Sequence, residues 1–169
     1  MEYRKATSTD LESLTQLCII TFTQTYGAQN TPENLQLYLE NAFNPAQMTA
    51  ELQSDTEAYF FIAEAQEPIA YIKLNYNCYP PDVNDGNWIE IQRIYVLEKY
   101  QGKGLGKVLL QIAETEARQA NASHIWLGVW EQNPKAIAFY QKNGFTIIGK
   151  HDFWVGNDRQ TDFVMQKQI

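Results

Sequence analysis

Three glycines at alternate positions stand between a stretch typical of a β-strand and one typical of a helix. Gly102, Gly104 and Gly106 follow a β-branched run that ends at Val96, and an amphipathic helix begins at Leu105. Because glycine has no Cβ, backbone N–H groups there can turn into one concavity, beside the free N–H groups of the helix. Such a loop is suited to bind a pyrophosphate. Without further context, the same glycines are also compatible with a simple tight turn.

Other chemistries lack the residues that they need. The glycine spacing fits neither the phosphate loop of nucleotide hydrolases nor the dinucleotide-binding fingerprint. His124 and His151 lie far apart without cysteine or carboxylate ligands at metal-binding spacing, so no metal site is expected. A Ser-His-Asp hydrolase would need a Gly-x-Ser-x-Gly elbow, which is absent. Cys18 falls on an apolar helix stripe and Cys78 in a loop, so neither is predicted to be a nucleophile.

The composition is that of an acidic globular chain. Its 169 residues include 13 Lys and Arg against 20 Asp and Glu, a formal charge of −7, and 44% are apolar. The charge argues against a nucleic-acid partner and suits a small cationic substrate. No apolar run reaches the roughly 18 residues of a membrane span, and no signal peptide is recognised. With only two cysteines, a cytoplasmic protein without membrane contact is expected.

In the second half of the chain, predicted strands and helices alternate, and these elements must position the glycine loop. Strands are predicted over 88–96, 125–130, 145–153 and 161–165, with helices over 105–119 and 134–142. This order predicts a single α/β domain over residues 1–169, with a mixed, mostly antiparallel central sheet flanked by helices.

The first half of the chain is predicted to supply three helices and three further strands. Strands are expected over 3–6, 58–63 and 69–74. A capping box at Thr9–Glu12 is expected to open the first helix, and Thr31-Pro32 and Asn44-Pro45 the next two. The irregular loop over 78–87 is expected to line a binding site.

Two motifs resemble those of the GCN5-related N-acetyltransferase (GNAT) superfamily. Gln101-x-x-Gly104-x-Gly106 is similar to the family's Gln/Arg-x-x-Gly-x-Gly/Ala motif, and it also stands between a strand and a helix. A second block follows at the family's usual distance, with Asn133, Ala136, Phe139, Tyr140, Gly144 and Phe145. The resemblance covers nearly the whole chain. The stretches 127–133 and 152–156 further resemble bacterial spermidine/spermine N-acetyltransferases.

The resemblance implies acetyl-CoA as co-substrate and a site built largely from backbone. The pantetheine arm would pair like an extra strand with Ile94 and Val96, on either side of Tyr95. Asn133 would contact the cofactor near its pantetheine or sulfur, although it also suits the N-cap of the next helix. Lys135 would reach the ribose phosphate. The pyrophosphate would lie after Gln101 on the amides of Gly102, Lys103, Gly104, Leu105, Gly106 and Lys107, where the two lysines either add charge or are merely solvated.

Two side chains are predicted to move protons. Tyr140 would donate to the departing thiolate as a general acid, the alternative being a packing tyrosine. Glu90, four residues before Ile94, stands where the histone-acetylating branch of the superfamily has its general base. Strand alternation predicts Glu90, Gln92 and Ile94 on one face, with the Ile94 amide holding the oxyanion. Deprotonation through waters, or a salt bridge of Glu90 with Arg93, stays open.

These expectations add up to an N-acetyltransferase that transfers acetyl directly to a primary amine in a ternary complex. A polyamine such as spermidine or spermine is the favoured acceptor. Acetylation of a protein or peptide, and acyl-CoA binding without catalysis, are the alternatives. Neither a metal nor a nucleic acid is expected as partner, and a homodimer is left open. The acceptor side is expected to gather the acidic residues Glu33, Glu40, Asp82, Asp85 and Glu90.

Overall fold

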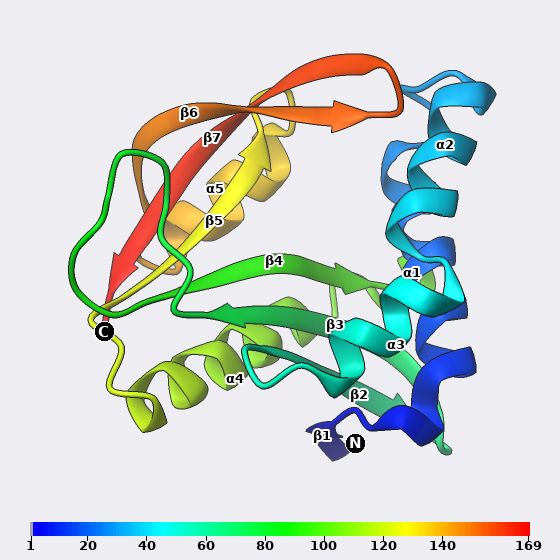
Figure 1. Ribbon diagram of the computed structural model, residues 1–169, viewed down its shortest axis with the longest axis horizontal. Helices are drawn as coiled ribbons and strands as arrows, with labels where there is room; N and C mark the ends of the chain where they lie inside the picture. Colours follow the sequence, from blue (N-terminus) through cyan, green and yellow to red (C-terminus); the bar gives the residue numbers. More distant parts are fainter. Residues whose placement is uncertain (1) are drawn as a thin grey trace.

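Seven strands form one sheet in the computed structural model, which describes residues 2–169 (Figure 1). The strand order is β1-β2-β3-β4-β5-β7-β6. All neighbours are antiparallel except β4 and β5, so the predicted mixed, mostly antiparallel α/β sheet is confirmed. The strands are β1 Glu2–Lys5, β2 Glu57–Glu64, β3 Glu67–Tyr76, β4 Trp88–Val96, β5 His124–Trp130, β6 Thr146–Val155 and β7 Asp158–Gln168.

Five α-helices flank the sheet, and local signals set their starts. Thr31 and Asn44 cap α2 and α3 through side-chain oxygens that accept backbone N–H groups. Proline follows each cap, because its missing N–H is not needed in a first turn. The helices are α1 Leu11–Tyr26, α2 Pro32–Ala42, α3 Pro45–Gln53, α4 Leu105–Gln119 and α5 Pro134–Lys142.

The capping box that precedes α1 lies two residues earlier than the sequence indicates. Thr7 and Asp10 form it around a short 3-10 turn, and the Thr7 N–H donates to Asp10 Oδ2 at 2.8 Å. Asp10 also receives both guanidinium N–H groups of Arg4, at 2.6 and 2.8 Å. The prediction of Thr9–Glu12 was wrong because the Arg4 contact, which comes from the neighbouring strand, fixes Asp10 rather than Glu12 as the capping acid.

Each face of the sheet carries its own core. Helices α4 and α5 pack on one face through residues such as Leu109, Ile112 and Tyr140. Helices α1, α2 and α3 cover the other face, around Phe22 and Tyr71 (Figure 1). The sheet is therefore buried on both sides over its centre, and Cys18 belongs to the second core as predicted. In residues 2–169 no helix is long and apolar enough to cross a lipid bilayer.

The strands β4 and β5 part soon after they begin. Their parallel pairing runs only from Trp88 to Glu90, and the two strands then diverge (Figure 1). On its other side β4 stays paired with β3 to Val96, through a bulge at which Gln92 has no opposite residue. The bulge corrects the predicted alternation, because Ile91 and Ile94 now share the α4 face while Glu90 lies on the opposite face.

The hairpin of β6 and β7 reaches across to α2. The Asn157 N–H donates to Asn34 Oδ1 at 3.0 Å, and Gln160 Nε2 donates to Asn30 Oδ1 at 3.0 Å. These bonds hold the far end of the hairpin against the helices of the other half, as Figure 1 shows.

Candidate active site

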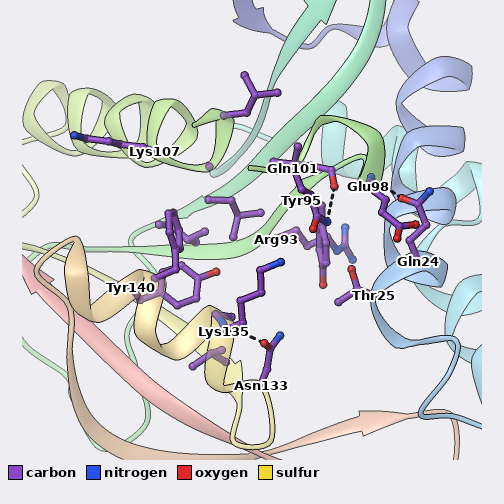
Figure 2. A pocket seen from close by; sticks show the side chains of 18 of the residues that line it. Gln24, Thr25, Arg93, Tyr95, Glu98, Gln101, Lys107, Asn133, Lys135 and Tyr140 are labelled. Carbon is purple, nitrogen blue, oxygen red and sulfur yellow. Dashed lines mark hydrogen bonds between the residues drawn. The ribbon is translucent and has the colours of Figure 1, made fainter. Parts of the chain in front are cut away.

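A cavity of about 590 Å³ occupies the opening between β4 and β5. Its walls come from the end of α1, the second half of β4, the loop into α4, β5, and α5 (Figure 2). This volume falls within the range of small-molecule sites. The cavity thus lies where the divergence of two parallel strands leaves backbone groups without a strand partner.

The glycine loop forms one end of the cavity. Gly102 and Gly104 have φ angles of +76° and +82°, a conformation that side chains rarely adopt. Gly104 is the N-cap of α4, and its carbonyl accepts the N–H groups of Lys107 and Val108. Leu105 and the residue after it thus precede the first helical hydrogen bonds, so their N–H groups and the helix dipole can serve an anion.

The third glycine of the motif serves packing instead. A Cβ added at Gly106 would lie 3.1 Å from the ring of Phe139 on α5. At Gly102 and Gly104 it would meet no atom within 4 Å in the described part of the chain. The first two glycines are therefore required by the loop conformation, whereas Gly106 lets α4 approach α5 closely.

The edge of β4 supplies the wall between the loop and α5. From Ile91 to Val96, β4 pairs with β3 alone among residues 2–169, and the β5 side of this stretch faces the cavity. The Gln101 side chain donates to the Val96 carbonyl at 3.2 Å, which ties the end of β4 to the loop. Unpaired strand groups of this kind can bind an extended, amide-containing ligand.

Tyr140 of α5 lines the cavity and points its hydroxyl into it (Figure 2). The side chain is 8% exposed and packs edge-on against Phe139 and Phe145. Burial, with a smaller contribution from Tyr26, raises the pKa of Tyr140 well above that of a free tyrosine. The phenol is consequently protonated at neutral pH and can donate a proton.

The polar residues predicted around the cofactor separate into two groups. Asn133, Lys107 and Lys135 line the cavity. Asn133 caps α5 with Oδ1, which accepts the Ala136 N–H at 3.1 Å, so its amide group stays available. Lys103 is outside the lining and holds its ammonium 4.8 Å from the Tyr100 ring centre.

Glu90 lies near the cavity but outside its lining. Its Oε2 accepts the Asn75 amide at 2.7 Å and the Cys78 thiol at 3.4 Å. The alternative of a salt bridge with Arg93 is wrong, because Arg93 bonds Glu51 at 3.1 Å. Its catalytic role stays a prediction.

The irregular loop after β3 does not line the cavity, contrary to expectation. The Trp126 indole donates to the Cys78 carbonyl at 2.8 Å, and the Trp88 indole donates to the Asp85 carbonyl at 2.9 Å. The loop therefore packs on two tryptophans. Four of the acidic residues predicted on the acceptor side are also outside the cavity lining: Glu33, Glu40, Asp82 and Asp85.

Several cavity residues escaped sequence reasoning. Gln24, Thr25 and Tyr26 come from the last turn of α1, and Gly128 comes from β5. Arg93 also lines the cavity (Figure 2). Its guanidinium bonds Glu51 at 3.1 Å. A tyrosine at the end of an amphipathic helix and a glycine within a strand were the available signals. Among residues 2–169 no cluster of three or more His, Cys, Asp or Glu side chains could hold a metal ion.

Known proteins are similar to this chain in sequence and in fold. The sequence model of the acetyltransferase (GNAT) family matches residues 24–145. An uncharacterized N-acetyltransferase of Lactobacillus delbrueckii subsp. lactis is 36% identical over 95% of this chain and 92% of its own. A spermidine N(1)-acetyltransferase of Thermoplasma acidophilum is 27% identical over 99% and 97%. The crystal structure of the PaiA N-acetyltransferase of Thermoplasma acidophilum in complex with coenzyme A superposes with a TM-score of 0.80, at 24% identity, over 99% of this chain and 98% of that one.

Proposed function

The chain belongs to the acetyltransferase (GNAT) family and is an acetyl-CoA-dependent N-acetyltransferase, and we propose that its acceptor is a primary amine of a polyamine such as spermidine or spermine. The observation that carries the proposed site is the cavity between β4 and β5, which has the glycine loop at one end and the Tyr140 hydroxyl within it. We propose that residues 1–169 act as one domain.

The cofactor is proposed to lie along the edge of β4. The backbone of Ile94, Tyr95 and Val96 would pair with the amides of the pantetheine arm, since this edge faces the cavity. The N–H groups of Gly102 to Gly106 would hold the pyrophosphate, whereas the Lys107 N–H already donates to the Gly104 carbonyl at 3.1 Å and leaves only its side chain for the anion. Asn133 and Lys135 would contact the cofactor from α5, because both line the cavity opposite β4.

Tyr140 is proposed as the general acid. The acceptor nitrogen attacks the thioester carbonyl, a C–N bond forms, and the C–S bond breaks. The phenol then donates its proton to the leaving sulfur, which a raised pKa at Tyr140 keeps available at neutral pH. No covalent acetyl-enzyme is required, so both substrates are expected to be bound together.

A polyamine acceptor is supported by charge and by relatives. The chain carries a formal charge of −7. Spermidine acetylation is the named activity of the Thermoplasma relative. A second relative, from Bacillus subtilis, is named a spermine/spermidine N(1)-acetyltransferase and is 38% identical over 77 residues, 44% of this chain. A small cation would be attracted to an acidic protein more strongly than a neutral amine would be.

The test is a panel of amines with release of coenzyme A as the readout. Spermidine and spermine should give the highest kcat/KM, ahead of a neutral-bodied monoamine, a peptide with a free N-terminus and a lysine peptide with a blocked N-terminus. Double-reciprocal plots should intersect, as direct transfer requires. Preferential turnover of either peptide would overturn the polyamine proposal, and parallel plots would overturn direct transfer.

A further inference from the structure

Two polar side chains of the β6–β7 hairpin meet over a glycine of β5. His151 of β6 lies opposite Asp162 of β7, and His151 Nε2 is 3.8 Å from Asp162 Oδ2. A Cβ added at Gly128 would lie 2.8 Å from Nε2 and 3.0 Å from Oδ2. A side chain at position 128 would therefore have to displace one or both groups.

Both groups hold a buried atom without a partner. Within residues 2–169, neither His151 Nε2 nor Asp162 Oδ1 has a hydrogen-bond partner, although both atoms are shielded from solvent. Asp162 as a whole is 7% exposed. Leaving a buried polar atom unpaired costs about 1–3 kcal/mol, and more for a charged group. A ligand that donates N–H groups would satisfy Asp162 Oδ1, and it would satisfy His151 Nε2 in the tautomer that leaves this nitrogen unprotonated.

The pair lies next to the cavity through Gly128, although His151 and Asp162 are themselves outside its lining. Gly128, beneath the pair, lines the cavity, as does Tyr26 at the end of α1. Tyr26 packs edge-on against Trp130, which lies opposite Asp162 in the sheet. Burial raises the pKa of Tyr26 to about 12, and the Asp162 carboxylate adds to this rise. The pair therefore stands on the face of β5 away from α5, so an amine there can approach the thioester from the side opposite Tyr140.

We propose that the acceptor ammonium binds over Gly128, donates to Asp162 Oδ1, and gives a proton to His151 Nε2 before it attacks. This inference rests on the proposed acetyl transfer. The N–H bond breaks, its proton forms an imidazolium with His151, and the freed lone pair forms the C–N bond. The nitrogen loses its second proton as the amide forms, and this proton replaces the one that Tyr140 gives to sulfur. Because Nε2 is shielded from solvent, the imidazolium, whose side chain is 28% exposed, releases a proton to solvent from Nδ1.

The surroundings of His151 suit this role. Asp162 on β7 raises the pKa of His151 above its ordinary value of 6.5, burial opposes the rise, and Glu90 on β4 and Asp152 on β6 add to it. The Trp126 ring of β5 packs edge-on against the imidazole. A base is most effective when its pKa lies near the working pH. Because neutral imidazole is the active form, kcat/KM should rise as pH increases through this raised pKa.

The first experiment compares His151→Gln and Asp162→Asn with His124→Gln, whose ring stacks on Trp88 away from the cavity. With spermidine, His151→Gln should lower kcat/KM about 10²-fold at unchanged coenzyme A affinity. It should also abolish the limb of the pH profile in which kcat/KM rises with pH through the pKa of His151. Asp162→Asn should raise the spermidine KM and move the limb to lower pH, as expected of a positioning residue. His124→Gln should behave as the parent. A limb that persists in His151→Gln but disappears in Glu90→Gln would overturn the inference in favour of Glu90.

A second measurement uses the unmodified protein. The chain has two histidines, so NMR can follow each imidazole separately. The spectrum of His124→Gln shows which of the two resonances belongs to His151. Adding spermidine to the coenzyme A complex should shift the His151 resonance and lower its pKa, because a cation then lies beside it. An unchanged His151 resonance with saturating spermidine would overturn the inference. If the parent acetylates peptides but no polyamine, the polyamine proposal fails and the His151 comparison is decided on the peptide; turnover of no amine overturns both.

Discussion

The two sides of the cavity are built from different kinds of group, backbone on one side and side chains on the other. On the side proposed for the cofactor, consecutive backbone groups at the end of β4 and the start of α4 face the cavity. On the side proposed for the acceptor, Tyr26 of α1 lines the cavity, and His151 of β6 and Asp162 of β7 lie next to it over Gly128. Backbone geometry follows from a short local motif, whereas a convergent group of side chains exists only once the whole sheet has formed.

The largest expected effect lies where the two sides meet. Tyr140→Phe removes the proton donor with little change in volume, so kcat should fall roughly 10²-fold or more. The KM for acetyl-CoA should change little, because the proposed binding is made by backbone. Steady-state kinetics across pH measure both, with Tyr3→Phe, an exposed tyrosine of β1, as the control. Turnover of Tyr140→Phe at the parent rate would assign this tyrosine to packing.

The second largest effect should be confined to the cofactor side. Gly104→Ala forces a side chain into φ +82°, at a cost of about 1–2 kcal/mol. If binding must restore this conformation, coenzyme A affinity should fall about 5- to 30-fold while the spermidine KM stays near the parent value. Gly149→Ala is the matched control, since its Cβ meets nothing within 4 Å in the described residues and its φ is not positive. Calorimetry that finds equal affinity for both variants would contradict the glycine-loop assignment.

Salt should distinguish the two sides by charge. Attraction between exposed charges is screened beyond about 8 Å at physiological ionic strength. The KM for spermidine should therefore rise severalfold as salt increases, and that for a neutral-bodied monoamine should rise less. Initial rates at fixed pH and saturating acetyl-CoA measure both. Spermidine kinetics that are indifferent to salt would count against a cationic acceptor.

The smallest effects concern the lysines of the cofactor side. Lys107→Gln and Lys135→Gln should each weaken coenzyme A binding about two- to fivefold at low salt, as partly screened charges do. Lys103→Gln should leave affinity unchanged, because Lys103 lies over Tyr100 outside the cavity lining. Calorimetry measures the coenzyme A affinity of the three variants, and Lys103→Gln is the control. An equal loss in all three would indicate a general charge effect.

Local signals predicted most of the fold. The bounds of β4, α4 and α5 match the predicted ranges, because caps, glycines and apolar periodicity specify them within a few residues. The capping box before α1 was misplaced, since the arginine that selects Asp10 comes from β1. The bulge at Gln92 was also missed, because a bulge depends on register with β3, and strict alternation then placed Glu90 on the wrong face.

The candidate site divides in the same way. The loop motif and the block that contains Tyr140 were each recognised from residues that lie close together in the sequence. The structure brings both to one cavity. His151 was considered only as a metal ligand, because its neighbour Asp162 is 11 positions away in the sequence and reaches it by hairpin pairing. Gly128 carried no signal beyond a glycine in a strand, and its role appears only when the two side chains above it are placed.

Amide hydrogen exchange with and without coenzyme A tests the central claim, that backbone at the β4–β5 opening binds the cofactor. Coenzyme A should slow exchange most at residues 94–96 and 102–107, all of which except Lys103 line the cavity. The loop over 78–87, which packs on Trp88 and Trp126, should exchange at the same rate in both states. Protection that is absent from residues 94–96 and 102–107, or that is strongest in the loop over 78–87, would contradict the account.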